Sequence, residues 1–301
     1  MSTSIIPAIM SGGAGSRLWP VSTDADPKQF HALADAKKSL FVSTVERVRG
    51  AAGDAAFADP IVLCNVRHAG RVREHLGKVG VANATLVLEP TSRNTAAVAA
   101  VAAAVSAERD PNALVLLLPA DHVIANAEAF RAAIARAAPF ARERIVTFGI
   151  TPDRPATGYG YIKRGAALGE GVFAIDSFRE KPDAATARDY LSQPTYSWNA
   201  GIFLSHPTIL LREFEKSAEI RDQALAALGQ ASRRPGEIVL DAAIYERTPA
   251  MPFDIAVMEK TSWAAVAPCE IGWADIGAWD EIWRISPQDD HGNAIHGAVI
   301  A

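Results

Sequence analysis

Near the start of the chain, the stretch Ser11-Gly12-Gly13-Ala14-Gly15-Ser16-Arg17 follows directly on the apolar run Ile5–Met10. Glycines at the end of a strand let backbone N–H groups approach phosphate oxygens, because no Cβ stands in the way. Arg17 and Lys28 add a planar guanidinium and a compact ammonium. The loop is not a Walker motif, and Leu18 breaks the dinucleotide-binding pattern. By itself it predicts an anion-binding turn, and the alternative is an ordinary turn with two solvated cations.

Short apolar runs alternate with helical stretches through the first half of the chain. The predicted strands are Ile5–Met10, Ile61–Cys64, Thr85–Leu88, Ala113–Leu118 and Ile145–Gly149, and the helices between them are Leu40–Arg49, His68–Gly77, Thr95–Glu108 and Ala127–Ala141. Strands that are apolar on both faces and separated by helices predict an α/β fold, with a mostly parallel sheet between two helix layers. Ligands of such sheets bind at the carboxyl ends of the strands.

The pattern changes after about Thr151, where strands follow one another with little helix between them. These predicted strands are Tyr159–Lys163, Gly171–Lys181 and Gly201–Ser205. Helical patterns return later, before a last strand at Ala264–Pro268, and these helices are Ala184–Gln193, Pro207–Glu215, Ile220–Leu228 and Ile238–Tyr245. The second half of the chain is therefore predicted to be mixed.

Composition excludes several classes of protein. With 301 residues, 49% of them hydrophobic, the chain can bury a full core, and a net charge of -4 provides no basic field for nucleic acid. Cys64 and Cys269 are too few for a disulfide framework and are expected to be buried thiols in a reducing cytoplasm. No apolar run reaches membrane-spanning length. His68 and His75, seven apart on a predicted helix, are expected at the surface.

Seven segments, in order, resemble the signatures of sugar-1-phosphate nucleotidyltransferases, and specifically of mannose-1-phosphate guanylyltransferases. They extend over nearly the whole chain and are Ser11–Pro20 with Pro27–Phe30, Glu89–Ala96, Leu118–His122, Gly158–Ile162, Glu180–Pro182, Trp198–Gly201 and Gly272–Gly277. The resemblance implies a Rossmann-like nucleotidyltransferase fold. It also implies that mannose 1-phosphate and GTP react to give GDP-mannose and pyrophosphate. The nucleotide would then be held by the loop residues Ser11, Gly12, Gly13, Gly15 and Ser16.

Two aspartates are the predicted metal ligands. Asp121 follows the predicted strand Ala113–Leu118, and Asp275 lies in a glycine-flanked loop far along the chain. Mg²⁺ takes oxygen ligands, usually one or two carboxylates completed by water and phosphate. The alternative for Asp121 is a cap for the helix at Ala127–Ala141. With the resemblance, Arg17, Lys28, Asp121 and Asp275 become the predicted catalytic residues, and the lone His122 is left out of the site.

The sugar phosphate is expected in the second half of the chain. The resemblance implies that Glu180 and Asn199 contact sugar hydroxyls and that Lys181 approaches the phosphate, while the backbone at Gly160 passes close to the sugar. The alternatives are a charged strand end for Glu180 and Lys181 and a turn for Asn199.

Guanine recognition is assigned to Glu89, which follows the predicted strand Thr85–Leu88. Its carboxylate can accept from guanine N1–H and the exocyclic amine, a donor pair that adenine and uracil do not offer. Asn94 and Thr95 then open the alanine-rich helix. They are expected to cap this helix, to contact the base or ribose, or both.

We expect one nucleotidyltransferase domain over residues 1–285, with a nucleotide-binding half at about 1–150 and a sugar-binding half at 151–285. Residues 286–301 are expected to be a tail that begins a missing or truncated second domain. A cytoplasmic homodimer is the default expectation. Two rival hypotheses remain: a related enzyme that joins glucose 1-phosphate to dTTP, UTP or ATP, and a regulatory homologue that binds GDP-mannose without catalysis.

Overall fold

The computed structural model describes residues 3–13, 15–35 and 37–295. Ala14 of the glycine-rich loop and residues 296–301 of the predicted tail lie outside this range. Among the described residues, no helix combines the length and apolar character needed to cross a membrane.

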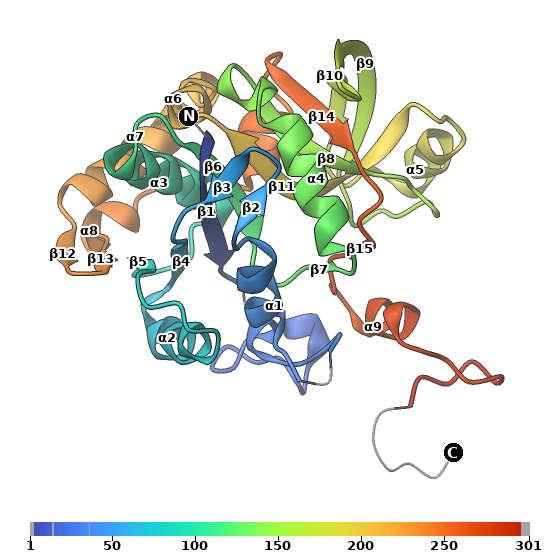
Figure 1. Ribbon diagram of the computed structural model, residues 1–301, viewed down its shortest axis with the longest axis horizontal. Helices are drawn as coiled ribbons and strands as arrows, with labels where there is room; N and C mark the ends of the chain where they lie inside the picture. The colour runs from blue at the N-terminus through green and yellow to red at the C-terminus, as the bar shows by residue number, and fades with distance from the viewer. Residues whose placement is uncertain (1–2, 14, 36, 296–301) are drawn as a thin grey trace.

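One large mixed sheet runs through the molecule (Figure 1). Its strands, in spatial order, are β12 (Ser232–Arg234), β13 (Glu237–Val239), β5 (Thr85–Glu89), β4 (Ile61–Asn65), β1 (Thr3–Ser11), β6 (Leu114–Pro119), β11 (Tyr196–Ser205), β8 (Ile145–Ile150), β14 (Ala264–Pro268), β10 (Val172–Arg179) and β9 (Tyr161–Gly169). The short strands β2 (Ala51–Ala52) and β3 (Ala55–Phe57) extend it beside β1. The neighbours from β13 to β6 are parallel, as predicted for the first half, whereas β11 runs antiparallel to β6 and β8.

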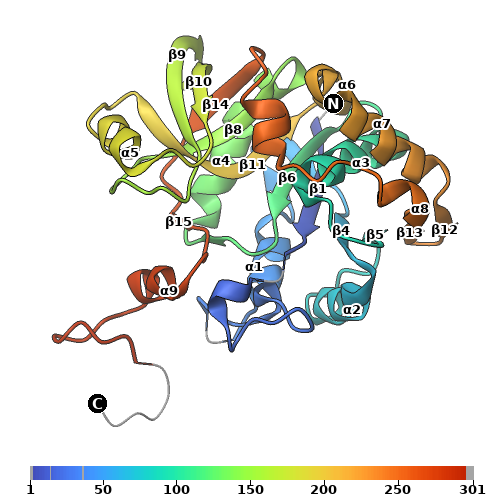
Figure 2. The same cartoon turned by 180° about the vertical axis from the view of Figure 1, so that it is seen from behind.

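Helices cover both faces of this sheet, as the alternating pattern predicted. On one face, α1 (Leu40–Arg47), α2 (Ala69–Lys78) and α4 (Ala127–Ala137) share a core with the strands. On the other face lie α3 (Asn94–Arg109), α6 (Pro207–Arg212), α7 (Ala218–Gly229) and α8 (Ala242–Tyr245), which Figure 2 shows gathered at one side of the molecule. The alanines of α3 from Ala96 to Ala103 are buried, because small side chains let the helix lie close to the sheet. The predicted α/β fold is confirmed.

Two predicted helices differ most from the structure in their bounds. The segment Ile238–Tyr245 begins as a strand, because Ile238 lies on β13, which pairs with the edge of β5, and only α8 is helical. The turn before it is formed by Gly236, whose φ is 72°. The helix predicted for Ala127–Ala141 ends at Ala137, and a 3₁₀ turn follows Pro139, whose ring and missing N–H oppose continuation.

The prediction of surface histidines was also wrong. His68 and His75 are 7% and 4% exposed and pack against the Phe30 ring. Each has a polar partner, the Asp24 carbonyl for His68 and the Ser39 hydroxyl for His75. Periodicity does not distinguish a satisfied interior histidine from a surface one. Cys64 is buried as expected, and Cys269 is partly buried.

Three short elements bring distant parts of the chain together. β7 (Val123–Ile124) pairs with β15 (Trp273–Ala274), so the residues that precede β7 lie beside those that follow β15. A π-helix, η6 (Asp254–Met258), packs in the core beneath α3. The last helix, α9 (Trp279–Ile285), lies at the periphery in both views (Figures 1 and 2).

Candidate active site

The glycine-rich loop leaves the carboxyl end of β1, where Ser11 is buried and its hydroxyl lies 3.4 Å from the Gln29 side-chain nitrogen. Gly13 and Gly15 have φ values of 90° and 57°, a region that favours glycine. A Cβ at Gly15 would come within 3.0 Å of Lys28 Cγ. Glycine at this position therefore allows the loop and Lys28 to approach each other.

Lys28 joins the two predicted metal ligands. Its Nζ lies 3.1 Å from Asp121 Oδ2 and donates to the backbone carbonyls of Asp275 and Ile276 at 2.9 and 2.8 Å. These three acceptors match the three protons of an ammonium group. The pairing of β7 with β15 holds the two acidic loops side by side. Residues that lie far apart in the sequence thus form one cluster.

Asp275 is held through one carboxylate oxygen. Its Oδ1 accepts from the Tyr159 hydroxyl at 3.1 Å and from the Gly277 backbone N–H at 3.0 Å. Its Oδ2 accepts no hydrogen bond from the described part of the chain. Arg17 belongs to the same cluster. A Cβ built on Gly277 would lie 3.2 Å from Arg17 Nη2 and 3.0 Å from the Asp275 carboxylate, so both groups border the same glycine. The Arg17 side chain is exposed and can reach a ligand.

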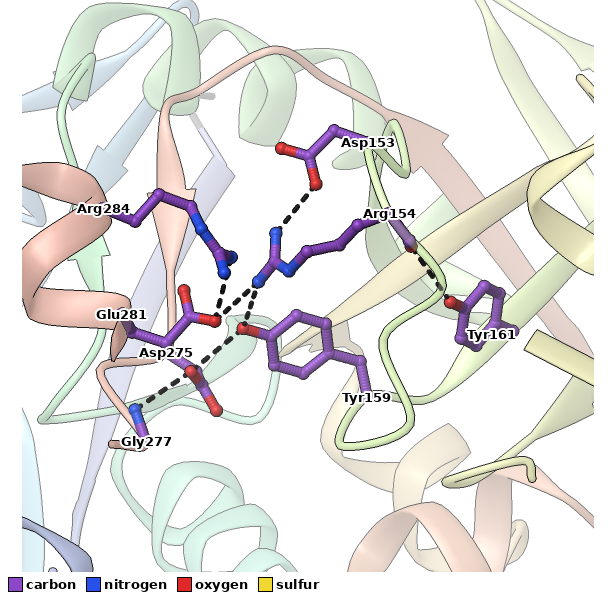
Figure 3. A network of polar contacts seen from close by, with 8 residues as sticks. All are labelled: Asp153, Arg154, Tyr159, Tyr161, Asp275, Gly277, Glu281 and Arg284. Carbon is purple, nitrogen blue, oxygen red and sulfur yellow. Dashed lines mark hydrogen bonds and ion pairs between the residues drawn. The ribbon is translucent and has the colours of Figure 1, made fainter. Parts of the chain in front are cut away.

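Tyr159 connects Asp275 to the last helix (Figure 3). The Arg154 guanidinium donates to the Tyr159 oxygen at 3.2 Å and to Glu281 Oε1 on α9 at 2.6 Å. Arg284, one turn along α9, donates to the same Glu281 oxygen at 3.1 Å. Burial and the charges of Asp275 and Glu281 raise the pKa of Tyr159, so its hydroxyl stays protonated as a donor. A continuous chain of polar contacts therefore runs from α9 to Asp275.

A cavity of about 320 Å³, here the Glu89 cavity, opens beside the glycine-rich loop and is lined by residues that include Gly12, Gly13, Asn65, His68, Glu89 and Ser92. Glu89 is 5% exposed, and its Oε2 accepts from the Tyr245 hydroxyl at 2.7 Å. Burial raises the pKa of Glu89 to about 7. Its other oxygen is left for a ligand donor. A carboxylate thus lies in the cavity next to the loop, and its contact with a base stays a prediction.

A second cavity of about 190 Å³, the Asn199 cavity, is lined by residues that include Thr95, Tyr159, Gly160, Glu180, Asn199 and Asp254. The Asn199 side chain lies between Thr147, whose hydroxyl is 2.7 Å from Oδ1, and Asp254, whose Oδ1 accepts from Nδ2 at 2.7 Å. A Cβ at Gly160 would lie 2.7 Å from Glu180 Oε2, so glycine allows this carboxylate to fit. Asp275 also lines this cavity, which joins Glu180 and Asn199 to the acidic cluster.

Of the two residues that open α3, Thr95 lines this second cavity and Asn94 lines neither cavity. Asn94 has a φ of 62°, and its Oδ1 accepts from the Thr95 backbone N–H at 3.0 Å. The Thr95 hydroxyl accepts from the Phe253 backbone N–H at 2.8 Å, which fixes the segment before η6. Thr95 therefore lines the Asn199 cavity rather than the Glu89 cavity.

Comparison with known proteins adds the observation that decides the family. The model of the family described as nucleotidyl transferase matches residues 6–292. The chain belongs to the nucleotidyl transferase family.

Among the relatives of this nucleotidyl transferase is the alginate biosynthesis protein AlgA of Pseudomonas aeruginosa, which is 44% identical over 98% of this chain and 61% of its own length. A mannose-1-phosphate guanylyltransferase of Salmonella muenchen is 40% identical over 99% of this chain and 63% of its own length. The chain thus spans about three fifths of the length of these curated relatives. A solved structure titled mannose-1-phosphate geranyltransferase, from Thermus thermophilus, aligns with a TM-score of 0.81 and 29% identity, over 95% of this chain and 80% of that chain.

Most predicted site residues of this nucleotidyl transferase lie together. Lys28 contacts the Asp121 carboxylate and the Asp275 backbone carbonyl, and the capping alternative for Asp121 was wrong, because Asn126 caps α4. His122, left out of the predicted site, has a structural partner in the Trp273 indole, which lies 3.2 Å from its Nδ1.

Lys181 stands apart from the other predicted site residues. Its side chain is 60% exposed and its Nζ pairs with Glu180 Oε1 at 2.6 Å. Lys181 lines neither cavity, and a phosphate that reached its ammonium group would compete with Glu180.

Sequence patterns missed Asp254 and the contacts of Arg154 and Glu281. Asp254 is a lone acid between Phe253 and an apolar run, and no spacing marks it. Arg154 and Glu281 are 127 positions apart, and each resembles an ordinary surface charge until α9 is placed. Only the short Gly158–Ile162 segment indicated that the backbone near Tyr159 mattered.

Proposed function

We propose that this nucleotidyl transferase makes GDP-mannose and pyrophosphate from GTP and mannose 1-phosphate. One observation carries the proposal: the cluster of Lys28, Asp121 and Asp275 connects the glycine-rich loop, which borders the Glu89 cavity, to the Asn199 cavity. Such an arrangement provides a place for two anions on either side of a charged centre. The similarity to proteins named mannose-1-phosphate guanylyltransferase supports the choice of both substrates.

The chemistry needs charge neutralisation more than proton transfer. An oxygen of the sugar phosphate attacks the α-phosphorus of GTP in line, and the bond from that phosphorus to the bridging oxygen of pyrophosphate breaks. The attacking phosphate is already an anion at neutral pH, so no general base is required. The protein must align two anions that repel each other and stabilise the leaving pyrophosphate. Arg17 and Lys28 supply cations for this task.

A magnesium ion fits the two aspartates. Asp121 and Asp275 offer hard oxygen ligands, and Asp275 keeps Oδ2 available because its other oxygen is held by Tyr159 and Gly277. Among the described residues, no cluster of three or more carboxylate, histidine or cysteine side chains surrounds one point. Mg²⁺ commonly combines one or two carboxylates with water and substrate phosphates, and the two aspartates suit that donor set. When bound, the ion would neutralise charge on the α-phosphate.

The two cavities divide recognition between base and sugar. Glu89 accepts from guanine, while Ser11, Gly12, Gly13, Gly15 and Ser16 hold the phosphates through the loop. On the sugar side, Glu180 and Asn199 bind hydroxyls, Gly160 brings the backbone close, and Lys181 meets the phosphate. We also assign the enzyme to the cytoplasm as a homodimer, and light scattering on the purified protein measures the second point.

A pyrophosphate-release assay tests the function directly. GTP, dTTP, UTP and ATP are each paired with mannose 1-phosphate and with glucose 1-phosphate, with Mg²⁺ present. We expect the highest kcat/KM for GTP with mannose 1-phosphate. A higher value for another pair identifies the rival pyrophosphorylase. Tight GDP-mannose binding without turnover of any pair identifies the regulatory homologue.

A further inference from the structure

A second carboxylate, Asp254, lines the Asn199 cavity together with Glu180. It is the first residue of the π-helix η6, an element that is rare in proteins and frequent at functional sites. The residue after this helix, Glu259, accepts from the Glu180 backbone N–H at 2.9 Å through Oε1. Both ends of η6 therefore contact the sugar side of the proposed site.

The contacts of Asp254 leave half of its carboxylate available. Oδ1 accepts from Asn199 Nδ2 at 2.7 Å, and Oδ2 has no hydrogen bond from any other described residue. Among those residues, no cation lies within ion-pair distance of Asp254. Burial, with the nearby charge of Glu180, raises the pKa of Asp254 to about 7. A carboxylate in this situation is destabilised unless a donor reaches it.

Asp254 also determines which way the Asn199 amide points. In the structure the amide turns its nitrogen toward Asp254 and its oxygen toward the Thr147 hydroxyl, the orientation that suits an ionised carboxylate, which only accepts hydrogen bonds. The Asn199 amide then keeps one free N–H. The cavity wall consequently presents one amide donor, the free oxygen of Asp254 and the Glu180 carboxylate, a combination suited to neighbouring hydroxyl groups.

We propose that Asp254 accepts a hydrogen bond from one hydroxyl of the bound sugar and so helps to select which sugar phosphate the site accepts. The proposal rests on the proposed function, because it assumes a sugar phosphate in the Asn199 cavity. It adds to that function a residue that touches the substrate directly. A site built to bind a hydroxyl discriminates strongly against an analogue that lacks it, because the buried acceptor is left unpaired.

The variant Asp254→Asn separates substrate binding from the positioning of Asn199. Its amide oxygen still accepts from Asn199 Nδ2, while the free oxygen becomes an NH₂ group that donates. Wild type and variant are assayed with mannose 1-phosphate and with each of its monodeoxy analogues at saturating GTP. The exposed Asp222 on α7, changed to Asn, is the matched control and keeps wild-type kinetics.

We expect the wild type to lose about 10- to 100-fold in kcat/KM on one deoxy analogue, the range for a hydrogen bond to a charged group. With mannose 1-phosphate, the kcat/KM of Asp254→Asn should fall below the wild-type value by about the same factor. With that one deoxy analogue, the kcat/KM of the variant should equal that of the wild type, and the KM for GTP should be unchanged. If Asp254→Asn lowers kcat/KM by the same factor with mannose 1-phosphate and with every analogue, Asp254 only positions Asn199. If the kinetics of the variant are unchanged, Asp254 neither binds the sugar nor positions Asn199. Both results overturn the proposal.

The same experiment distinguishes failure of the proposed function from failure of this proposal. If the wild type prefers a different sugar phosphate, the proposed function fails, and the deoxy series of that sugar still tests Asp254. If there is no turnover, calorimetric titration with GDP-mannose and its deoxy analogues gives the same comparison as ratios of Kd. Absence of any sugar-nucleotide binding overturns both.

Discussion

Lys28 has partners on both acidic loops, and its ammonium group is 2.8 to 3.1 Å from three acceptors. Removing it eliminates a cation from the reaction centre and leaves Asp121 and two backbone carbonyls without their donor. We expect Lys28→Ala and Asp121→Ala each to lower turnover at least about 100-fold while the fold persists, since preorganised charge dominates this chemistry. Pyrophosphate release measures the effect, and circular dichroism confirms folding.

Lys37, an exposed lysine nearby in the sequence, supplies the matched control for Lys28. Lys37→Ala should keep wild-type turnover. Lys28→Arg keeps the charge but not the compact geometry and should recover only part of the activity. Wild-type turnover in a folded Lys28→Ala or Asp121→Ala protein would contradict the assignment of this site.

Glu89 makes stability depend on pH. Burial raises its pKa from the ordinary 4.5 to about 7, so the folded protein binds a proton that the unfolded chain has released between these values. The contribution of this proton to the free energy of unfolding is complete below about pH 4.5 and is lost as the pH rises through 7. Glu89→Gln stays neutral and keeps an acceptor for Tyr245. We expect it to exceed wild type in free energy of unfolding by roughly 3 kcal/mol at about pH 8 and by little at about pH 5.

Urea denaturation of both proteins at the two pH values measures this difference. Glu74 is an exposed acid on α2, and Glu74→Gln is the control. Its free energy of unfolding should not exceed that of the wild type at the higher pH. A Glu89→Gln effect of the same size at both pH values would show that packing, rather than ionisation, is responsible.

At the scale of secondary-structure elements, α9 is tied to the acidic cluster through Glu281, Arg154 and Tyr159 (Figure 3). Groups that orient a metal ligand commonly change metal affinity by about 10- to 100-fold when they are lost. Glu281 is one step further away, so we expect Glu281→Ala to raise the half-saturating Mg²⁺ concentration by about tenfold or less. Electron paramagnetic resonance of Mn²⁺ added with GTP measures the affinity without turnover.

The neighbouring acid on the same helix, Asp280, is exposed and lacks a hydrogen-bond or ion-pair partner in the described structure. Asp280→Ala therefore removes the same charge from α9 without touching the polar chain, and should leave Mg²⁺ dependence unchanged. Equal effects of the two substitutions would show that α9 acts through its overall charge. If neither substitution changes the Mg²⁺ dependence, α9 does not influence the site.

Elements stabilised by local pattern were predictable, and those stabilised by distant pairing were not. The buried helix α3 and the strand β14 follow from alanine content and apolar runs, which act within the segment itself. β13 forms because β5, far away in the sequence, offers an edge, and periodicity alone cannot show this. The same limit applies to the site: motifs identified Lys28 and Asp275, but the contact between Asp254 and Asn199 depends on where η6 packs.

At the scale of the whole molecule, the sheet crosses the boundary between the two predicted halves. β11 pairs with β6, and β14 pairs with β8, so strands after residue 151 lie against strands before it. The cores on both faces likewise combine residues from both halves. Separating the two halves would expose a sheet edge and an apolar face on each of them. The predicted division at about residues 150 and 151 therefore does not separate two folding units.

We therefore expect one thermal unfolding transition, and we expect GDP-mannose to raise the Tm of that whole transition. A ligand at about 100-fold its Kd stabilises the folded state by about 3 kcal/mol, which corresponds to about 5 °C in Tm for a chain of this size. Scanning calorimetry with GDP-mannose at that concentration measures the shift, and UDP-glucose at the same concentration is the control, for which we expect a smaller one. Two transitions, only one of which moves, would show instead that the nucleotide and sugar halves unfold independently.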